Sequence, residues 1–170
     1  MPWPVHVDLV SQWTIPAPLE RVWGAIVDAE RWPQWWPGVA AVRTVRAGGA
    51  GGEGAIRRIE WSSRFGRAVV ADVEAIELKP NELLRSRCRG PCDGEGLWLL
   101  RSEGGRTLVT CVWRVKLGRG WMRFLVPLIA PLLRWNHRAV MCAGERGLVR
   151  HLAGSARPQP RPAQRVDFDA

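Results

Sequence analysis

The chain has 170 residues, a length that fits one domain with a substantial hydrophobic core. Hydrophobic residues make up 46% of it and charged residues 24%, a globular composition, and proline interrupts its longest apolar stretch, so we expect no membrane span. The net charge of +9 is carried almost entirely by arginine, but no known nucleic-acid-reading motif accompanies it, so we expect no nucleic-acid partner. The N-terminus shows no signal-peptide pattern, which favours a cytoplasmic protein.

Residues 5–15 alternate between apolar and polar side chains, which predicts a half-buried strand. After Pro18, apolar residues recur at the helical spacing i, i+3, i+4 and i+7, which predicts a short amphipathic helix. The next segment, residues 28–38, contains Trp32, Trp35 and Trp36 and is interrupted by proline. It predicts a second short helix that ends in a turn.

Beyond residue 39 the hydrophobic period is two, and glycine- and proline-rich turn signals divide this region into six further strands. Connections this short favour antiparallel neighbours, because a parallel crossover needs a dozen or more residues. The sequence therefore predicts a seven-stranded antiparallel meander. Its later strands are expected at Ala40–Arg46, Glu53–Ser62, Arg67–Leu78, Leu83–Arg89, Gly94–Arg101 and Arg106–Leu117.

A long amphipathic helix is predicted over Pro131–Leu152, with Gly154 and Pro158 as its stop signal. A strongly curved sheet with one long helix on its concave face is an α+β arrangement. We expect residues 1–153 to form this single ligand-binding domain. Residues 154–170, rich in proline and arginine, are expected to be a disordered tail. The predicted covered face of the helix carries Leu133, His137, Val140, Gly144, Gly147, Leu148 and His151.

Two glycines on this covered face need an explanation, because each costs roughly 1 kcal/mol of helix propensity relative to alanine. Gly144 and Gly147 either leave room for a ligand or allow close packing against bulky indoles such as Trp61 and Trp113. The sequence leaves both interpretations open.

Two stretches, residues 15–23 and 32–38, resemble the opening of the START-related polyketide cyclase/dehydrase and lipid-transport superfamily. Residues 52–59 and 135–148 fit its looser patterns, so the resemblance covers roughly residues 5–153. It implies the SRPBCC, or Bet v 1-like, helix-grip fold, in which seven antiparallel strands grip a long C-terminal helix and leave a largely apolar cavity. Members include cyclases, aromatases and lipid carriers, so the resemblance implies the fold more specifically than the function.

Candidate site residues follow from the side chains expected to face this cavity. Arg57 is a charge in an inward, otherwise apolar phase, and we expect Asp72 or Glu74 to neutralise it, with an anionic or carbonyl-bearing ligand as the alternative. On the strand at residues 94–101 both phases are equally apolar, so its inward face is not predicted. The ligand-binding candidates are Arg57, Ile59, Trp61, Cys88, Trp98, Cys111, Trp113, His137, Met141 and Gly144.

These residues favour a binder of a hydrophobic or aromatic small molecule, lipid-like or polyketide-like, held between sheet and helix. The alternative is an enzyme of cyclase, aromatase or dehydrase type, in which His137 transfers a proton and Arg57 stabilises an enolate. The four cysteines and three histidines match no disulfide or metal pattern, so we expect free thiols, no metal and no cofactor. A weak peripheral membrane contact through residues 121–134 is a further hypothesis, and the oligomeric state is not predicted.

Overall fold

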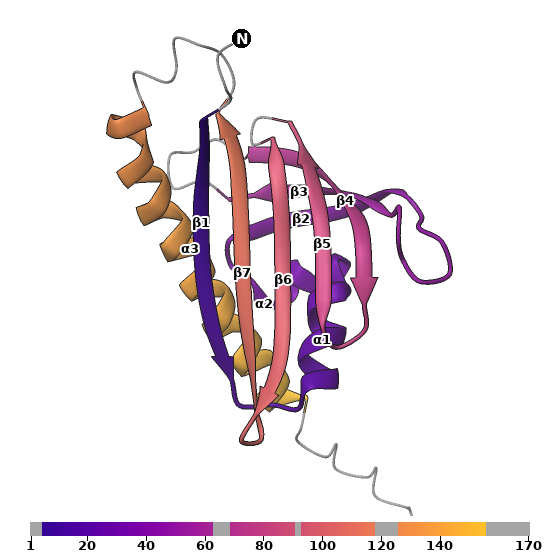
Figure 1. The fold of residues 1–170 in the computed structure, drawn as a ribbon. Coiled ribbons are helices and arrows are strands. Elements are labelled where there is room, and N and C mark those ends of the chain that lie inside the picture. Colours follow the sequence, from indigo (N-terminus) through magenta and orange to yellow (C-terminus); the bar gives the residue numbers. More distant parts are fainter. Residues whose placement is uncertain (1–4, 63–68, 91–92, 118–125, 156–170) are drawn as a thin grey trace, which may run out of the picture.

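Seven antiparallel strands form one sheet in the order β1-β7-β6-β5-β4-β3-β2 (Figure 1). The computed structural model describes residues 5–62, 69–90, 93–117 and 126–155. The strands are β1 (Val5–Ile15), β2 (Val39–Arg46), β3 (Ile56–Trp61), β4 (Val69–Lys79), β5 (Leu83–Arg89), β6 (Gly94–Glu103) and β7 (Arg106–Leu117). The helices are α1 (Leu19–Val27), the 3-10 turn η1 (Ala29–Arg31), α2 (Trp32–Trp35) and α3 (Val126–Gly154).

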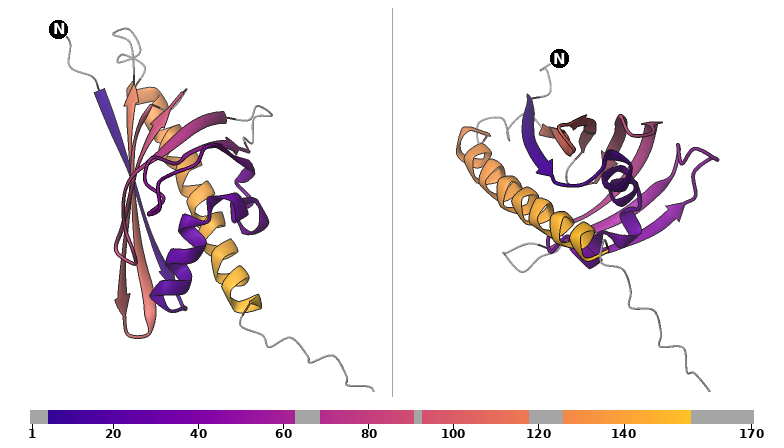
Figure 2. Two further views of the ribbon diagram at one scale, coloured as in Figure 1. Left: turned by 90° about the vertical axis from the view of Figure 1, so that its right-hand side faces the viewer. Right: turned by 90° about the horizontal axis from the view of Figure 1, so that it is seen from below.

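β1 and β2 are neighbours in sequence but lie at opposite edges of the sheet, because α1, η1 and α2 carry the chain from one edge to the other. All the helices lie on one side of the sheet, and the long α3 runs diagonally across that side (Figure 2). α3 packs mainly against β1 and also touches α2 and α1. This is the helix-grip arrangement expected from the sequence.

The inner face of the sheet follows the predicted apolar phases. On β5, Leu84, Ser86 and Cys88 are buried, while the arginines between them are exposed. On β6, where the sequence did not decide, Trp98 and Leu100 are the buried residues. Period-two alternation therefore sets which side chains of each strand reach the core.

Two elements begin three or more residues away from their predicted starts. β3 begins at Ile56 and not at Glu53, because Gly52 and Gly54 adopt positive φ angles of 85° and 77° in the preceding turn. α3 begins at Val126, five residues before the predicted start, so Pro131 lies inside the helix. A proline at this depth removes one backbone hydrogen bond, and the helix continues past it.

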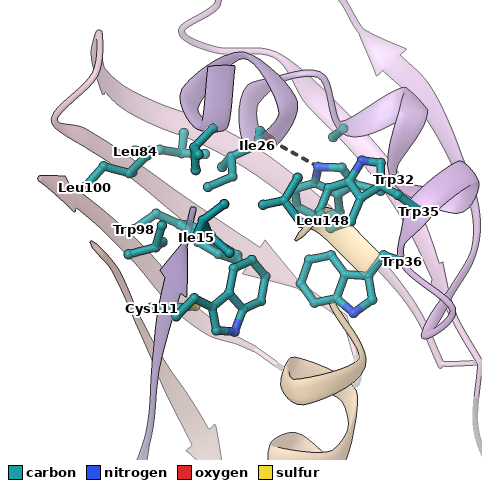
Figure 3. Packing of buried hydrophobic residues seen from close by; sticks show 14 of the residues in the cluster. Ile15, Ile26, Trp32, Trp35, Trp36, Leu84, Trp98, Leu100, Cys111 and Leu148 are labelled. Carbon is teal, nitrogen blue, oxygen red and sulfur yellow. Dashed lines mark hydrogen bonds between the residues drawn. The ribbon is translucent and has the colours of Figure 1, made fainter. Parts of the chain in front are cut away.

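The core between α2, α3 and the sheet is built around tryptophan. The indoles of Trp13, Trp36 and Trp98 lie with ring centroids 5.3–6.2 Å apart in edge-to-face geometry. Figure 3 shows labelled core residues from α1, α2, α3 and the strands meeting here, with the Trp32 indole donating a hydrogen bond to the Ile26 carbonyl at 3.1 Å. Aromatic side chains thus occupy most of the volume between sheet and helix.

The two helix glycines mark the closest approach of α3 to α2. A Cβ on Gly144 would lie 2.6 Å from the indole of Trp36, and one on Gly147 would lie 1.8 Å from the backbone oxygen of Trp35. Of the two interpretations that the sequence left open, close packing is the one found at both glycines, against the Trp36 indole and the Trp35 backbone and not against Trp61 and Trp113. The Trp36 indole nitrogen donates a hydrogen bond of 2.9 Å to the carbonyl of Val140, one turn before Gly144.

Candidate functional site

The interior space between sheet and helices is small. A hollow of about 50 Å³ remains there, bordered by apolar side chains and by Arg57, Ser86 and Trp98. Small-molecule sites usually occupy about 300–1,000 Å³, so this hollow has room for a few water molecules only. Tryptophan side chains, including Trp32 and Trp98 at the edge of this hollow, fill space that a ligand would otherwise occupy.

Arg57 points to this inner side of the sheet without the expected carboxylate. Asp72 pairs directly across the strands with Arg58, at 2.8 Å, and Glu74 pairs with Arg46, at 2.9 Å. The predicted salt bridge of Arg57 was wrong because the register of β3 on β4 places both carboxylates on the opposite face of the sheet. Among the described residues, the buried Nε of Arg57 has no hydrogen-bond partner.

The ion pair between Arg58 and Asp72, on the outer face of the sheet, shifts the pKa of the Asp72 carboxyl. Hydrogen bonds from the Arg58 guanidinium hold the pKa of the Asp72 carboxyl below its ordinary value. Both side chains are solvent-exposed, so this pair stabilises the fold little.

A larger hollow lies where α3 meets the edge strand β1. This groove has a volume of about 530 Å³, within the range of small-molecule sites. We call it the β1–α3 groove. Its lining residues are Asp8, Leu9, Val10, Ser11, Gln12 and Trp13 from β1, and Arg134, His137, Arg138, Met141, Cys142 and Glu145 from α3.

A hydrogen bond joins the two walls of the groove. Ser11 Oγ and His137 Nε2 lie 3.1 Å apart, and the imidazole is partly buried. Burial lowers the pKa of His137 below its ordinary value of 6.5, so the neutral ring is favoured at neutral pH. A neutral imidazole can accept a proton, which makes it the group in the groove best suited to proton transfer.

Another polar group in the groove lacks a partner. Trp13 is only 3% exposed, and its indole Nε1 has no hydrogen-bond acceptor among the described residues. A buried donor without a partner costs about 1–3 kcal/mol relative to one that is satisfied. The nitrogen itself is buried, so the groove does not expose this donor to a ligand.

The predicted site residues separate into three groups. His137 and Met141 line the β1–α3 groove, whereas Arg57, Ile59 and Trp98 line the small interior hollow. The other five border neither space. Trp61 stacks near Trp32 and Trp36, Cys88 and Cys111 are buried, Trp113 packs beside Val7, Leu9 and Val115, and Gly144 lies under Trp36.

The contribution of β1 to the groove was not predicted. The alternation of residues 5–15 predicted a half-buried strand, but nothing local indicated that Leu9, Ser11 and Trp13 lie beside the long helix. Arg134 and Arg138, which are exposed and line the groove, were not among the predicted site residues. Their spacing of four residues, which puts them on one helical face, was the available signal.

Residues 121–125 of the segment proposed for membrane contact, residues 121–134, lie outside the described residues. Within the described part of the chain, no helix is both long and apolar enough to cross a membrane. The same part holds no group of three or more His, Cys, Asp or Glu side chains placed to bind a metal ion.

The family follows from a direct match of the sequence. Residues 6–152 match the family model described as "Polyketide cyclase / dehydrase and lipid transport". The chain belongs to this family. Among curated proteins, none matches the sequence significantly.

Several solved structures have a similar fold. The Zhui aromatase/cyclase from Streptomyces sp. R1128 superposes with a TM-score of 0.71 at 14% identity, over 90% of this chain and 97% of its own. A START superfamily protein from Mycobacterium smegmatis gives 0.72 at 14% identity, over 89% and 100%. Ara h 8.0201 gives 0.63 at 12% identity, over 86% and 99%. At identities this low, the structural similarity shows a shared fold and does not identify the ligand.

Proposed function

We propose that this polyketide cyclase/dehydrase family protein binds a hydrophobic or aromatic small molecule, lipid-like or polyketide-like, in the β1–α3 groove. The observation that carries the proposal is the groove itself, a hollow of about 530 Å³ lined by both apolar and polar side chains. Leu9, Trp13 and Met141 supply apolar surface, and the Ser11–His137 pair supplies a polar contact point. Small-molecule sites combine apolar surface with polar groups that orient the ligand, and this groove offers both.

The burial of the groove's apolar side chains favours the β1–α3 groove over the small interior hollow as the ligand site. Leu9 is 7% exposed, Trp13 3% and Met141 5%, so these side chains are held by packing rather than by a ligand. The wall they form is therefore largely preformed. In the interior, by contrast, a ligand would have to displace the Trp32 and Trp98 side chains that border the remaining hollow.

The proposal is tested by titrating the purified protein with 1-pyrenebutanol, a neutral apolar fluorophore, and following energy transfer from tryptophan. Cys142→Trp places a large side chain in the groove at an exposed position of α3, and Ala153→Trp places it at an exposed position outside the groove. We expect Cys142→Trp to raise the Kd at least about tenfold and Ala153→Trp to leave it unchanged. No binding by the wild type, or equal binding by both variants, contradicts the proposal.

A second candidate function is catalysis of the cyclase or dehydrase type in the same groove. It is favoured by His137, a neutral imidazole within hydrogen-bond distance of Ser11 and therefore suited to act as a base. Arg57 lines the separate interior hollow, so it does not meet His137 at one ligand. Proton abstraction by His137 is therefore the part of the predicted mechanism that the geometry supports.

Hydrogen–deuterium exchange at the central carbon of a β-diketone, 1-phenylbutane-1,3-dione, tests the catalytic candidate by NMR. Exchange accelerated by the wild type and lost in His137→Asn, with binding retained, supports catalysis. Equal rates with and without protein exclude proton abstraction from this class of substrate.

We place this function in the cytoplasm. Cys111 and Cys142 are free thiols in the structure, which suits a reducing compartment.

A further inference from the structure

The β1–α3 groove contains two carboxylates, and both are already engaged. Asp8 accepts two hydrogen bonds from Arg114, at 2.9 and 3.2 Å, across the β1–β7 pair. Glu145 accepts a hydrogen bond of 2.9 Å from the backbone N–H of Thr14 and so joins α3 to β1. Neither carboxylate pairs with an arginine of α3.

The two arginines of the groove are left without a counter-charge. Arg134 and Arg138 both line it, both are exposed, and neither forms an ion pair within the described ranges of the chain. Residues four apart lie on the same helical face about one turn from each other, so both guanidinium groups can reach one ligand. The groove therefore combines apolar surface with two arginines that form no ion pair within the described part of the chain.

We infer that the ligand of the groove is an amphiphile with an anionic head group. Its apolar part lies against Leu9, Trp13 and Met141, and its anionic head lies at Arg134 and Arg138. This inference rests on the proposed function and adds the chemical class of the ligand. Planar guanidinium groups pair with carboxylate or phosphate oxygens through paired N–H donors, which gives them a preference for such heads over a neutral hydroxyl.

The position of the arginines agrees with this division of the ligand. Met141 is 5% exposed, whereas Arg134 and Arg138 are exposed, so the α3 wall changes from apolar to charged. An amphiphile bound in this orientation buries its apolar part and keeps its head hydrated. It therefore avoids the large desolvation cost of burying an anion.

The test compares two fluorescent probes that differ only at the head, 1-pyrenebutyrate and 1-pyrenebutanol. The variant Arg134→Gln with Arg138→Gln removes both charges from the groove. The control variant, Arg146→Gln with Arg150→Gln, removes two charges from exposed positions of the same helix outside the groove. Kd values are measured at low and at high salt for both probes and all three proteins.

We expect the wild type and the control to bind the carboxylate at least about fivefold more tightly than the alcohol at low salt, the scale of two partly exposed ion pairs. Raising the salt concentration should reduce this preference. The groove variant should lose the preference, because its Kd for the carboxylate rises more than its Kd for the alcohol. Displacement of the bound carboxylate probe by dodecanoate or by dodecyl phosphate then shows which anionic head is preferred.

Other outcomes overturn the inference in distinguishable ways. Equal affinity of the wild type for both probes leaves the proposed binding function standing and contradicts the anionic head. A preference that persists in the groove variant also contradicts it, because the charge would then be recognised elsewhere. Failure of both probes to bind contradicts the proposed function and the inference together.

Discussion

The Cα of Gly147 faces the backbone carbonyl of Trp35 so closely that a Cβ at this position would lie 1.8 Å from the oxygen. The obstacle is main chain, so no rotamer change can relieve it. α3 and α2 are therefore held at a separation that only glycine permits at this position. This contact fixes the C-terminal half of α3 against the tryptophan core.

Replacing Gly147 by alanine should destabilise the protein even though alanine is the better helix former. Accommodating the extra methyl group requires α2 or α3 to move, and overpacking of this kind costs about 1–3 kcal/mol. Urea unfolding followed by circular dichroism measures the change. Gly24→Ala is the matched control, because nothing lies within 4 Å of the added methyl group. It should be neutral or stabilising by up to about 1 kcal/mol, and equal losses in both variants would contradict the prediction.

The cost of Gly144→Ala should depend on Trp36. The added Cβ would lie 2.6 Å from the indole of Trp36, whereas the smaller ring of phenylalanine leaves that space. We expect Gly144→Ala to destabilise the wild type by about 1–3 kcal/mol and the Trp36→Phe variant by less. A double-mutant cycle in urea measures the coupling, and strictly additive losses would argue against this contact.

The free energy of unfolding should decrease as the pH is lowered, because of His137. The ring is neutral in both the folded and the unfolded chain above its ordinary pKa of 6.5, and burial lowers the pKa in the fold. As the pH falls below 6.5 the unfolded chain binds the proton first, so the free energy of unfolding decreases until the pH has passed the folded pKa. Unfolding curves between pH 7.5 and 5.5 measure this slope.

Two variants separate the causes of that slope. His137→Asn should flatten it, because the side chain at position 137 no longer titrates. Ser11→Ala should lose about 1 kcal/mol of stability with the hydrogen bond and keep the slope, because burial and not Ser11 lowers the pKa. An unchanged slope in His137→Asn would assign the pH dependence to other groups.

Thiol reactivity should distinguish Cys142 from the buried cysteines. Burial raises the pKa of the Cys111 thiol to about 12, and Cys88 is buried as well, whereas Cys142 is exposed in the groove. In a Cys92→Ser background, iodoacetamide at pH 8 should modify Cys142 and leave the other two intact until denaturant is added. Mass spectrometry of the peptides gives the result, and early modification of Cys111 would contradict its burial.

The sequence was a good guide to the fold because the fold depends on local periodicity. The alternation of Leu84, Ser86 and Cys88 with arginines was enough to set the inner face of β5. On β6 the same argument failed, because leucines stand in both phases and only the packing of Trp98 against Trp13 decides between them. Local pattern determines a strand, while its orientation can depend on distant partners.

The site was less predictable, because it depends on register and on contacts between distant segments. The inward phase of Arg57 follows from its neighbours, but the face that carries Asp72 depends on how β4 pairs with β3. Likewise, Ser11 and His137 are separated by most of the chain, and neither segment shows that it lies beside the other. The sequence indicated His137 as a polar residue of the helix, and only the fold supplied its partner.

The sheet order has a consequence for how the chain folds. β1 pairs along its whole length with β7, so that Ile15 lies opposite Thr107 and Leu9 opposite Trp113. During synthesis β1 emerges first and must wait for about a hundred residues before its partner strand exists. Closing so long a loop costs chain entropy before any contact compensates for it, which predicts slow folding. Until β7 arrives, Trp13 and the other apolar side chains of β1 are exposed and available to a chaperone.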